Sequence, residues 1–203
     1  MKSISYSEWV QFTFYGPETA EPGPPQWYPG SAPDAAAHLM TFFAMSKETL
    51  ALLPREVACA GLRLIPSIDG YGGLLSWPEL SYETRIAIAD AHFPLFRDTF
   101  SADGYDGAAF MWWEWLIGAR WNDGPSVQED QRIRRHMFAV IRHILTLESD
   151  ECIRSGVHGL NEFNCYDESE EEMREIIAGL LKSRPLSAEL VRYAHRVADG
   201  QAP

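Results

Sequence analysis

The chain has 203 residues, of which 46% are hydrophobic and 23% charged, and its formal net charge is −12. This length and apolar fraction suit one domain with a sizeable core and exclude a disordered chain. No run of about 18 uncharged apolar residues could span a bilayer, and the N-terminus lacks a hydrophobic signal region, so we expect a cytoplasmic protein. The negative charge also disfavours generic binding to nucleic acid or anionic lipid.

The first 33 residues differ in composition from the rest. They hold six of the thirteen prolines, together with several aromatic residues. Val10, Phe12 and Phe14 alternate with more polar positions, which predicts a possible short strand over 8–15. Two interpretations of residues 1–33 stay open: an aromatic arm that packs on the body of the same chain, or one that clasps a partner or a second copy.

From Asp34, a candidate N-cap, to residue 203 the pattern predicts one helical domain. Apolar residues recur at helical spacing, and Pro54 and Pro94 should break or kink the helices that contain them. No alternation of strands and helices occurs, so we predict an all-α fold. The expected helices cover 34–46, 48–65, 82–100, 107–121, 126–147, 149–163, 169–183 and 187–199.

The motif S-x-D-G-Y-x-G occurs twice, at 67–73 and 101–107. A duplicated helix–loop unit would produce such a pair. Asp and Gly also favour turns wherever they occur, so two unrelated turns are the alternative.

The cysteines predict neither a disulfide framework nor a metal site. Cys59, Cys152 and Cys165 are odd in number and contain no C-x-x-C pair. Cys152, His158 and Cys165 would lack a fourth zinc ligand. We therefore expect buried, reduced thiols, no metal and no cofactor.

Residues 150–160 read D-E-C-I-R-S-G-V-H-G-L, with Asp150, Ile153, Arg154, Val157 and Leu160 at key positions. This segment resembles the second helix of a HEAT repeat, and the next helix pair starts about 43 residues after the previous one, a spacing typical of such repeats. The resemblance implies antiparallel helix pairs stacked as a short HEAT-like solenoid or bundle. It also implies a structural role for Asp150 and Arg154. Gly156 and Gly159 depart from the pattern because glycine is a weak helix former.

Four of the seven tryptophans lie in 112–121, around Glu114. A carboxyl group among indoles could bind a cation or act as an acid with a raised pKa. The alternative is a core helix, because the tryptophans also recur at helical spacing. No catalytic motif is present elsewhere, so enzyme activity is the less favoured class. The candidate ligand pocket consists of Trp112, Trp113, Glu114 and Trp115.

The negative charge is concentrated in one segment. Between Glu148 and Glu175 there are ten acidic and two basic residues. Such a segment can solvate one end of the molecule and favour a helix N-terminus, or it can attract a basic partner.

These observations favour a non-enzymatic protein-binding module that engages a basic protein. Small acidic helical proteins of this style are similar to bacterial immunity proteins, which neutralise a toxin. The candidate partner-binding residues are Glu162, Asp167, Glu168, Glu170, Glu171 and Glu172, with Tyr166 and Trp121 as aromatic anchors. The alternative is an enzyme or a small-ligand receptor that uses the tryptophan pocket around Glu114.

Overall fold

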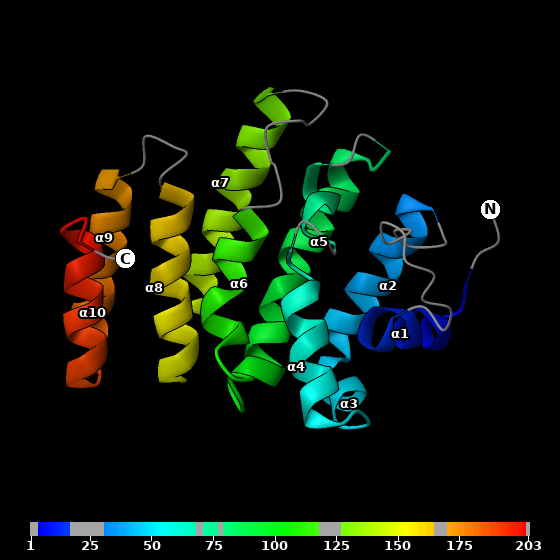
Figure 1. Ribbon diagram of the computed structural model, residues 1–203. Helices are drawn as coiled ribbons and strands as arrows, with labels where there is room; N and C mark the ends of the chain where they lie inside the picture. The colour runs from blue at the N-terminus through cyan, green and yellow to red at the C-terminus, as the bar shows by residue number, and fades with distance from the viewer. Residues whose placement is uncertain are drawn as a thin grey trace.

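The computed structural model describes residues 4–16, 31–67, 71–76, 79–117, 127–164 and 170–201. These residues form helices packed against one another, with no strand among them, as predicted (Figure 1). None of the described helices is long and apolar enough to cross a membrane. The helices are α1 (Tyr6–Tyr15), α2 (Ala32–Ala44), α3 (Ser46–Leu50), α4 (Arg55–Leu64), η1 (Gly72–Ser76), α5 (Tyr82–Leu95), η2 (Phe96–Phe100), α6 (Ala108–Ile117), α7 (Val127–Ile144), α8 (Asp150–Asn164), α9 (Glu170–Ser183) and α10 (Ala188–Ala198).

The strand expected over 8–15 is wrong, because these residues belong to helix α1. Ser5 and Glu8 form a capping box in which each side chain accepts a hydrogen bond from the other residue's backbone N–H, which satisfies donors at the helix start. The helix buries Trp9 completely, and the ring of Phe14 lies against Gly61 of α4. Burial of rings at helical spacing outweighed the weak alternation. The proline-rich remainder of the predicted arm lies outside the described residues.

Helices α2 to α4 begin at identifiable residues. The N-cap of α2 is Ser31 rather than Asp34, whose side chain instead accepts from the Ser31 backbone in a second capping box. Pro54 separates α3 from α4, and it is the N-cap of α4. The predicted break at this proline is therefore confirmed.

Pro94 lies inside the last turn of α5, where it removes a backbone hydrogen-bond donor. The chain does not stop there but continues directly into η2, a turn of π-helix in which the N–H of Ser101 bonds the carbonyl of Phe96 at 2.9 Å. A change in the hydrogen-bond ladder next to an internal proline is the expected physical response.

The second copy of the repeated motif forms a tight turn between η2 and α6. Tyr105, Asp106 and Gly107 all have positive φ, at 48°, 54° and 85°. The Asp103 carboxylate accepts a hydrogen bond from the N–H of Tyr105 at 2.7 Å and forms an ion pair with Arg55. The Arg55 guanidinium also lies over the Tyr105 ring. These contacts hold a backbone shape that non-glycine residues rarely adopt. The first copy includes residues outside the described part of the chain.

Helix α8 lies at the centre of the C-terminal half, where it contacts α6, α7, α9 and α10. A Cβ added to Gly156 would lie 2.7 Å from Leu145, which directly follows α7, and one added to Gly159 would lie 2.8 Å from the buried Trp113 ring of α6. The two glycines that depart from the HEAT pattern are thus close-approach points between helices. Their weak helix propensity is offset by the packing that they permit.

A comparison of three glycine-to-alanine variants tests this role. We expect Gly159→Ala to lower the free energy of unfolding by about 1–3 kcal/mol, because the new methyl group overlaps a rigid, buried ring. Gly156→Ala should act in the same direction, moderated by the flexibility of Leu145. Gly179→Ala is the control: a Cβ there meets no atom within 4 Å, so better helix propensity should stabilise the protein by about 0.5–1 kcal/mol. Urea unfolding measures all three, and equal effects at Gly159 and Gly179 would contradict the packing role.

Candidate functional site

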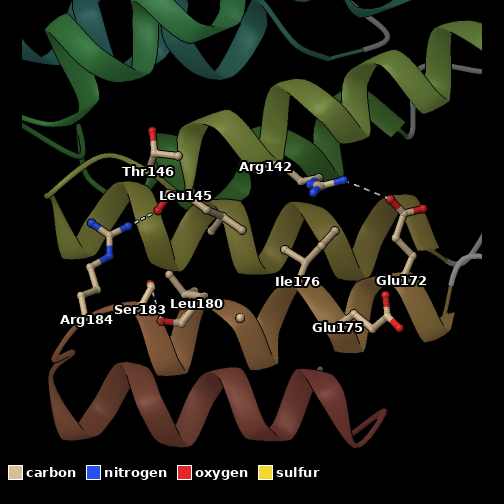
Figure 2. A pocket seen from close by; sticks show the side chains of 10 residues that line it. Arg142, Leu145, Thr146, Glu172, Glu175, Ile176, Leu180, Ser183 and Arg184 are labelled. Atoms are coloured by element: carbon tan, nitrogen blue, oxygen red, sulfur yellow. Dashed lines mark hydrogen bonds and ion pairs between the residues drawn. The ribbon is translucent and has the colours of Figure 1, made fainter.

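A groove of about 670 Å³ runs between α7 and α9 on the surface of the C-terminal half (Figure 2). One wall comes from Arg142 in the last turn of α7 and the residues just after the helix, and the other from most of the length of α9. The groove is lined by Arg142, Leu145, Thr146, Glu172, Glu175, Ile176, Gly179, Leu180, Ser183 and Arg184.

The groove between α7 and α9 results from the packing of each helix on other helices. Helix α7 packs on α5 and α8, whereas α9 packs on α8 and α10. Leu145 and Leu180 are buried at its base, and Ile176 is partly buried. At Gly179 the wall carries no side chain, and the space above it is open. The groove therefore has an apolar floor and a gap in the middle of one wall.

The two arginines of the groove are already engaged by the protein itself. Arg142 forms an ion pair with Glu172 at 3.3 Å, across the groove from α7 to α9. Arg184 donates to the carbonyl of Leu147 at 2.6 Å and to that of Leu145, near the C-terminal end of α7. Carbonyls at a helix C-terminus lack partners within the helix and favour a cation, so Arg184 completes the end of α7.

The acidic residues of α9 divide into paired and unpaired ones. Glu170 pairs with Arg174 one turn later, and Glu172 pairs with Arg142. Glu171 and Glu175 are exposed, and within the described residues neither forms an ion pair. Of the predicted partner-binding set, the structure places Glu172 in the groove lining and Glu171 next to it on α9, whereas Glu170 pairs with Arg174, which also donates to the Ala198 carbonyl of α10. Asp167, Glu168, Tyr166 and Trp121 lie outside the described residues.

Glu162 lies apart from this acidic row. It is partly buried on α8, and burial, together with the charge of Glu114 on α6, raises the pKa of its carboxyl group. The two glutamates that entered different hypotheses at the sequence level, Glu162 and Glu114, are thus electrostatic neighbours in the fold.

The tryptophans of α6 fill the core. Trp112 and Trp113 are completely buried, and Trp113 donates its indole N–H to Ser155 at 2.9 Å. Trp115 is only partly buried, and Glu114 is exposed. The cavity that Trp112 helps to line measures about 10 Å³, which is room for about one water molecule. Among the described residues these tryptophans therefore form packed core rather than a ligand-sized pocket.

A buried histidine lies beside Glu114. His158 is 3% exposed, stacks on Phe110 at 4.2 Å and is hydrogen-bonded through Nδ1 to the Tyr193 hydroxyl at 3.2 Å. Its Nε2 has no hydrogen-bond partner among the described residues and lies 3.9 Å from a carboxylate oxygen of Glu114. Burial lowers the pKa of His158 to about 4, and burial raises the pKa of Tyr193 to about 12. Both groups are therefore neutral near pH 7.

The groove lining combines apolar, hydroxyl and charged side chains. Its lining contains no cysteine, histidine or tyrosine, and its hydroxyl groups donate to nearby helix carbonyls: Thr146 to His143 and Ser183 to Leu180. The described residues also contain no group of three or more side chains placed to hold a metal ion. An apolar floor flanked by charged side chains is suited to binding another macromolecule.

Sequence reasoning named Glu172 of the groove lining, but it missed Glu175 and the apolar floor. Ile176, Gly179, Leu180 and Ser183 recur at spacings of three and four, which marks one face of α9. That signal was present in the sequence. The sequence could not show that α7 lies far enough from α9 to leave this face uncovered.

Compared with protein-family models, with curated proteins and with solved structures, the chain gives no significant match. The site must therefore be interpreted from its own geometry.

The two buried histidines predict a loss of stability in acid. His92, like His158, has its pKa lowered to about 4 by burial, here between Phe43 and the α6 tryptophans. An unfolded histidine titrates near 6.5, so the unfolded chain binds more protons than the native one as the pH falls from about 6.5 to 4. Each histidine should cost about 2 kcal/mol of unfolding free energy between pH 7 and pH 5.

Urea unfolding at the two pH values measures this loss. His158→Gln, which keeps a polar group of similar size but cannot titrate, should remove part of the pH dependence. An unchanged slope in that variant would show that His158 is not protonated on unfolding.

Proposed function

We propose that this protein is a non-enzymatic protein-binding module that engages a basic protein through the α7–α9 groove and its acidic rim. An immunity-type inhibitor that binds a basic toxin in the cytoplasm is the form of this function that we favour. The observation that carries the proposal is a pair of exposed carboxylates on α9 without ion-pair partners among the described residues: Glu175, which lines an apolar-floored groove, and Glu171, one turn before it on the same helix.

The charge balance of the site supports a cationic partner. Both arginines of the groove are occupied, Arg142 by Glu172 and Arg184 by backbone carbonyls. Near the start of α9, the charged side chains without ion-pair partners among the described residues are the carboxylates of Glu171 and Glu175. A basic surface would neutralise them, and the overall charge of −12 would accelerate its approach by electrostatic steering.

The packing order of the C-terminal helices supports a HEAT-like arrangement as part of the proposal. Helix α5 contacts α7, α6 contacts α8, and α8 contacts α10, so alternate helices along the chain are neighbours. Arg154 lies over the Phe110 ring of α6 and 4.0 Å from Glu189 of α10. These contacts join three helices and agree with the structural role that the HEAT resemblance implies for this arginine.

Charge reversal on α9 tests the proposed function. The immobilised protein would be used to capture proteins from the lysate of its native host, with quantitative mass spectrometry at low and high salt. We expect a basic protein that is lost by at least about tenfold in the double variant Glu171→Lys/Glu175→Lys and that is released by salt.

The matched control for this experiment is Glu48→Lys/Glu56→Lys. It changes the net charge by the same amount at exposed positions on α3 and α4, and it should retain the captured protein. Equal capture by both double variants would sink the proposal that the α9 rim is the binding surface.

A second candidate function rests on the cluster around His158, where a buried imidazole and two glutamates converge. Glu114→Gln removes the exposed carboxylate from this cluster. If the α9 rim is the binding surface, this variant should retain the captured partner and change only the melting temperature. Loss of capture in Glu114→Gln, with α9 intact, would transfer the function to the α6–α8–α10 side.

A further inference from the structure

We infer that the α7–α9 groove receives an amphipathic helix of the partner, with apolar residues facing the groove floor and basic residues beside Glu171 and Glu175. This inference rests on the proposed function and names the structural element that it would recognise. It is argued from the length of the groove, the chemistry of its walls and its charges.

The groove has the length of a short helix. Its lining on α9 runs from Glu172 to Ser183, eleven residues further on, which corresponds to about 17 Å or three helical turns. Along this length the floor presents Leu145, Ile176 and Leu180. A helix that lies lengthwise in the groove would meet these side chains with apolar residues spaced three, four and seven apart.

Other modes of peptide binding fit the walls less well. An extended strand binds by pairing its backbone with a free sheet edge, but both walls here are helices whose backbone groups are hydrogen-bonded internally. A polyproline segment requires a groove lined by aromatic rings, and none of the ten lining residues is aromatic. A helix needs neither feature, because its own backbone is already satisfied.

Gly179 permits close approach at the middle of the groove. It is the only lining residue of α9 without a side chain, and a Cβ built on it meets no atom within 4 Å. No atom in the described part of the chain therefore requires a glycine there. An incoming helix could pack directly on the backbone of α9 at this position, as helices do where one of them carries glycine.

The charges at the groove indicate which charged residues the partner's helix should carry. Glu171 and Glu175 are one turn apart on the same edge of α9, so both can face one turn of a neighbouring helix. The arginines of the groove are engaged with Glu172 and with the end of α7, which leaves Glu175 as the unmatched charge of the lining, with Glu171 beside the groove one turn earlier. Lysine or arginine residues flanking the apolar face would match them.

A peptide-display experiment tests the inference directly. A phage library of helical peptides of about 16 residues would be selected on the full-length protein, with counter-selection on the variant Gly179→Trp, whose indole fills the groove. We expect enriched peptides with apolar residues at helical spacing and a net positive charge. By fluorescence anisotropy, Gly179→Trp should weaken the binding of a synthetic enriched peptide by at least about tenfold.

Matched variants make the outcome decisive. Gly179→Ala should weaken binding less than Gly179→Trp, because one methyl group occupies far less of the groove than an indole, and Ser183→Trp should block the groove from a second exposed position. Circular dichroism and thermal melting check that each variant is folded. If no enriched peptide distinguishes wild type from both tryptophan variants, or if the enriched peptides lack helical spacing or are acidic, the inference is overturned.

The same variants separate this inference from the proposed function. Loss of the captured partner in Glu171→Lys/Glu175→Lys, with full retention in both tryptophan variants, would leave the acidic rim as the binding surface and remove the helix from the groove. Loss in the tryptophan variants alone would keep the groove and remove the electrostatic contribution.

Discussion

Helix α8 can lie against α6 and α7 only because two of its residues have no side chain. Gly156 leaves room for Leu145, and Gly159 leaves room for the ring of Trp113. Interiors are packed as densely as organic crystals, so an overlap of one methyl group at such points must be relieved by moving a helix. The position of α8 in turn determines where α9 and α10 dock.

The groove is a consequence of this arrangement. The Leu145 side chain packs against Gly156 of α8 and forms part of the groove floor. Helix α9 packs on α8 and α10 rather than on α7. The ion pair between Arg142 and Glu172 and the hydrogen bonds from Arg184 join the two walls near opposite ends of the groove. A groove thus forms between two helices that both pack on α8.

Charge on this molecule has several distinct roles. Glu170 and Glu172 are used within the fold, by Arg174 and Arg142, and all acidic residues of the first turn of α9 favour its helix dipole. Glu162 is held partly buried near Glu114 and has a raised pKa. Among the acidic residues of α9, only Glu171 and Glu175 are both exposed and without an ion pair to another described residue. A count of acidic residues could not separate these roles, because the separation depends on which arginine each carboxylate reaches.

The sequence by itself determined that the chain is all-α, where most of its helices begin and end, and that Pro54 separates two of them. These features follow from local chemistry: apolar periodicity, caps and the missing N–H of proline. It failed at α1, where a capping box and buried rings outweighed an alternating pattern. Only the tertiary structure decided that Trp112 and Trp113 fill the core, that Gly156 and Gly159 are close-approach points, and that one face of α9 stays uncovered. Each of these depends on the distance between helices far apart in the chain, and that distance is set by the packing of all their side chains together rather than by any single segment.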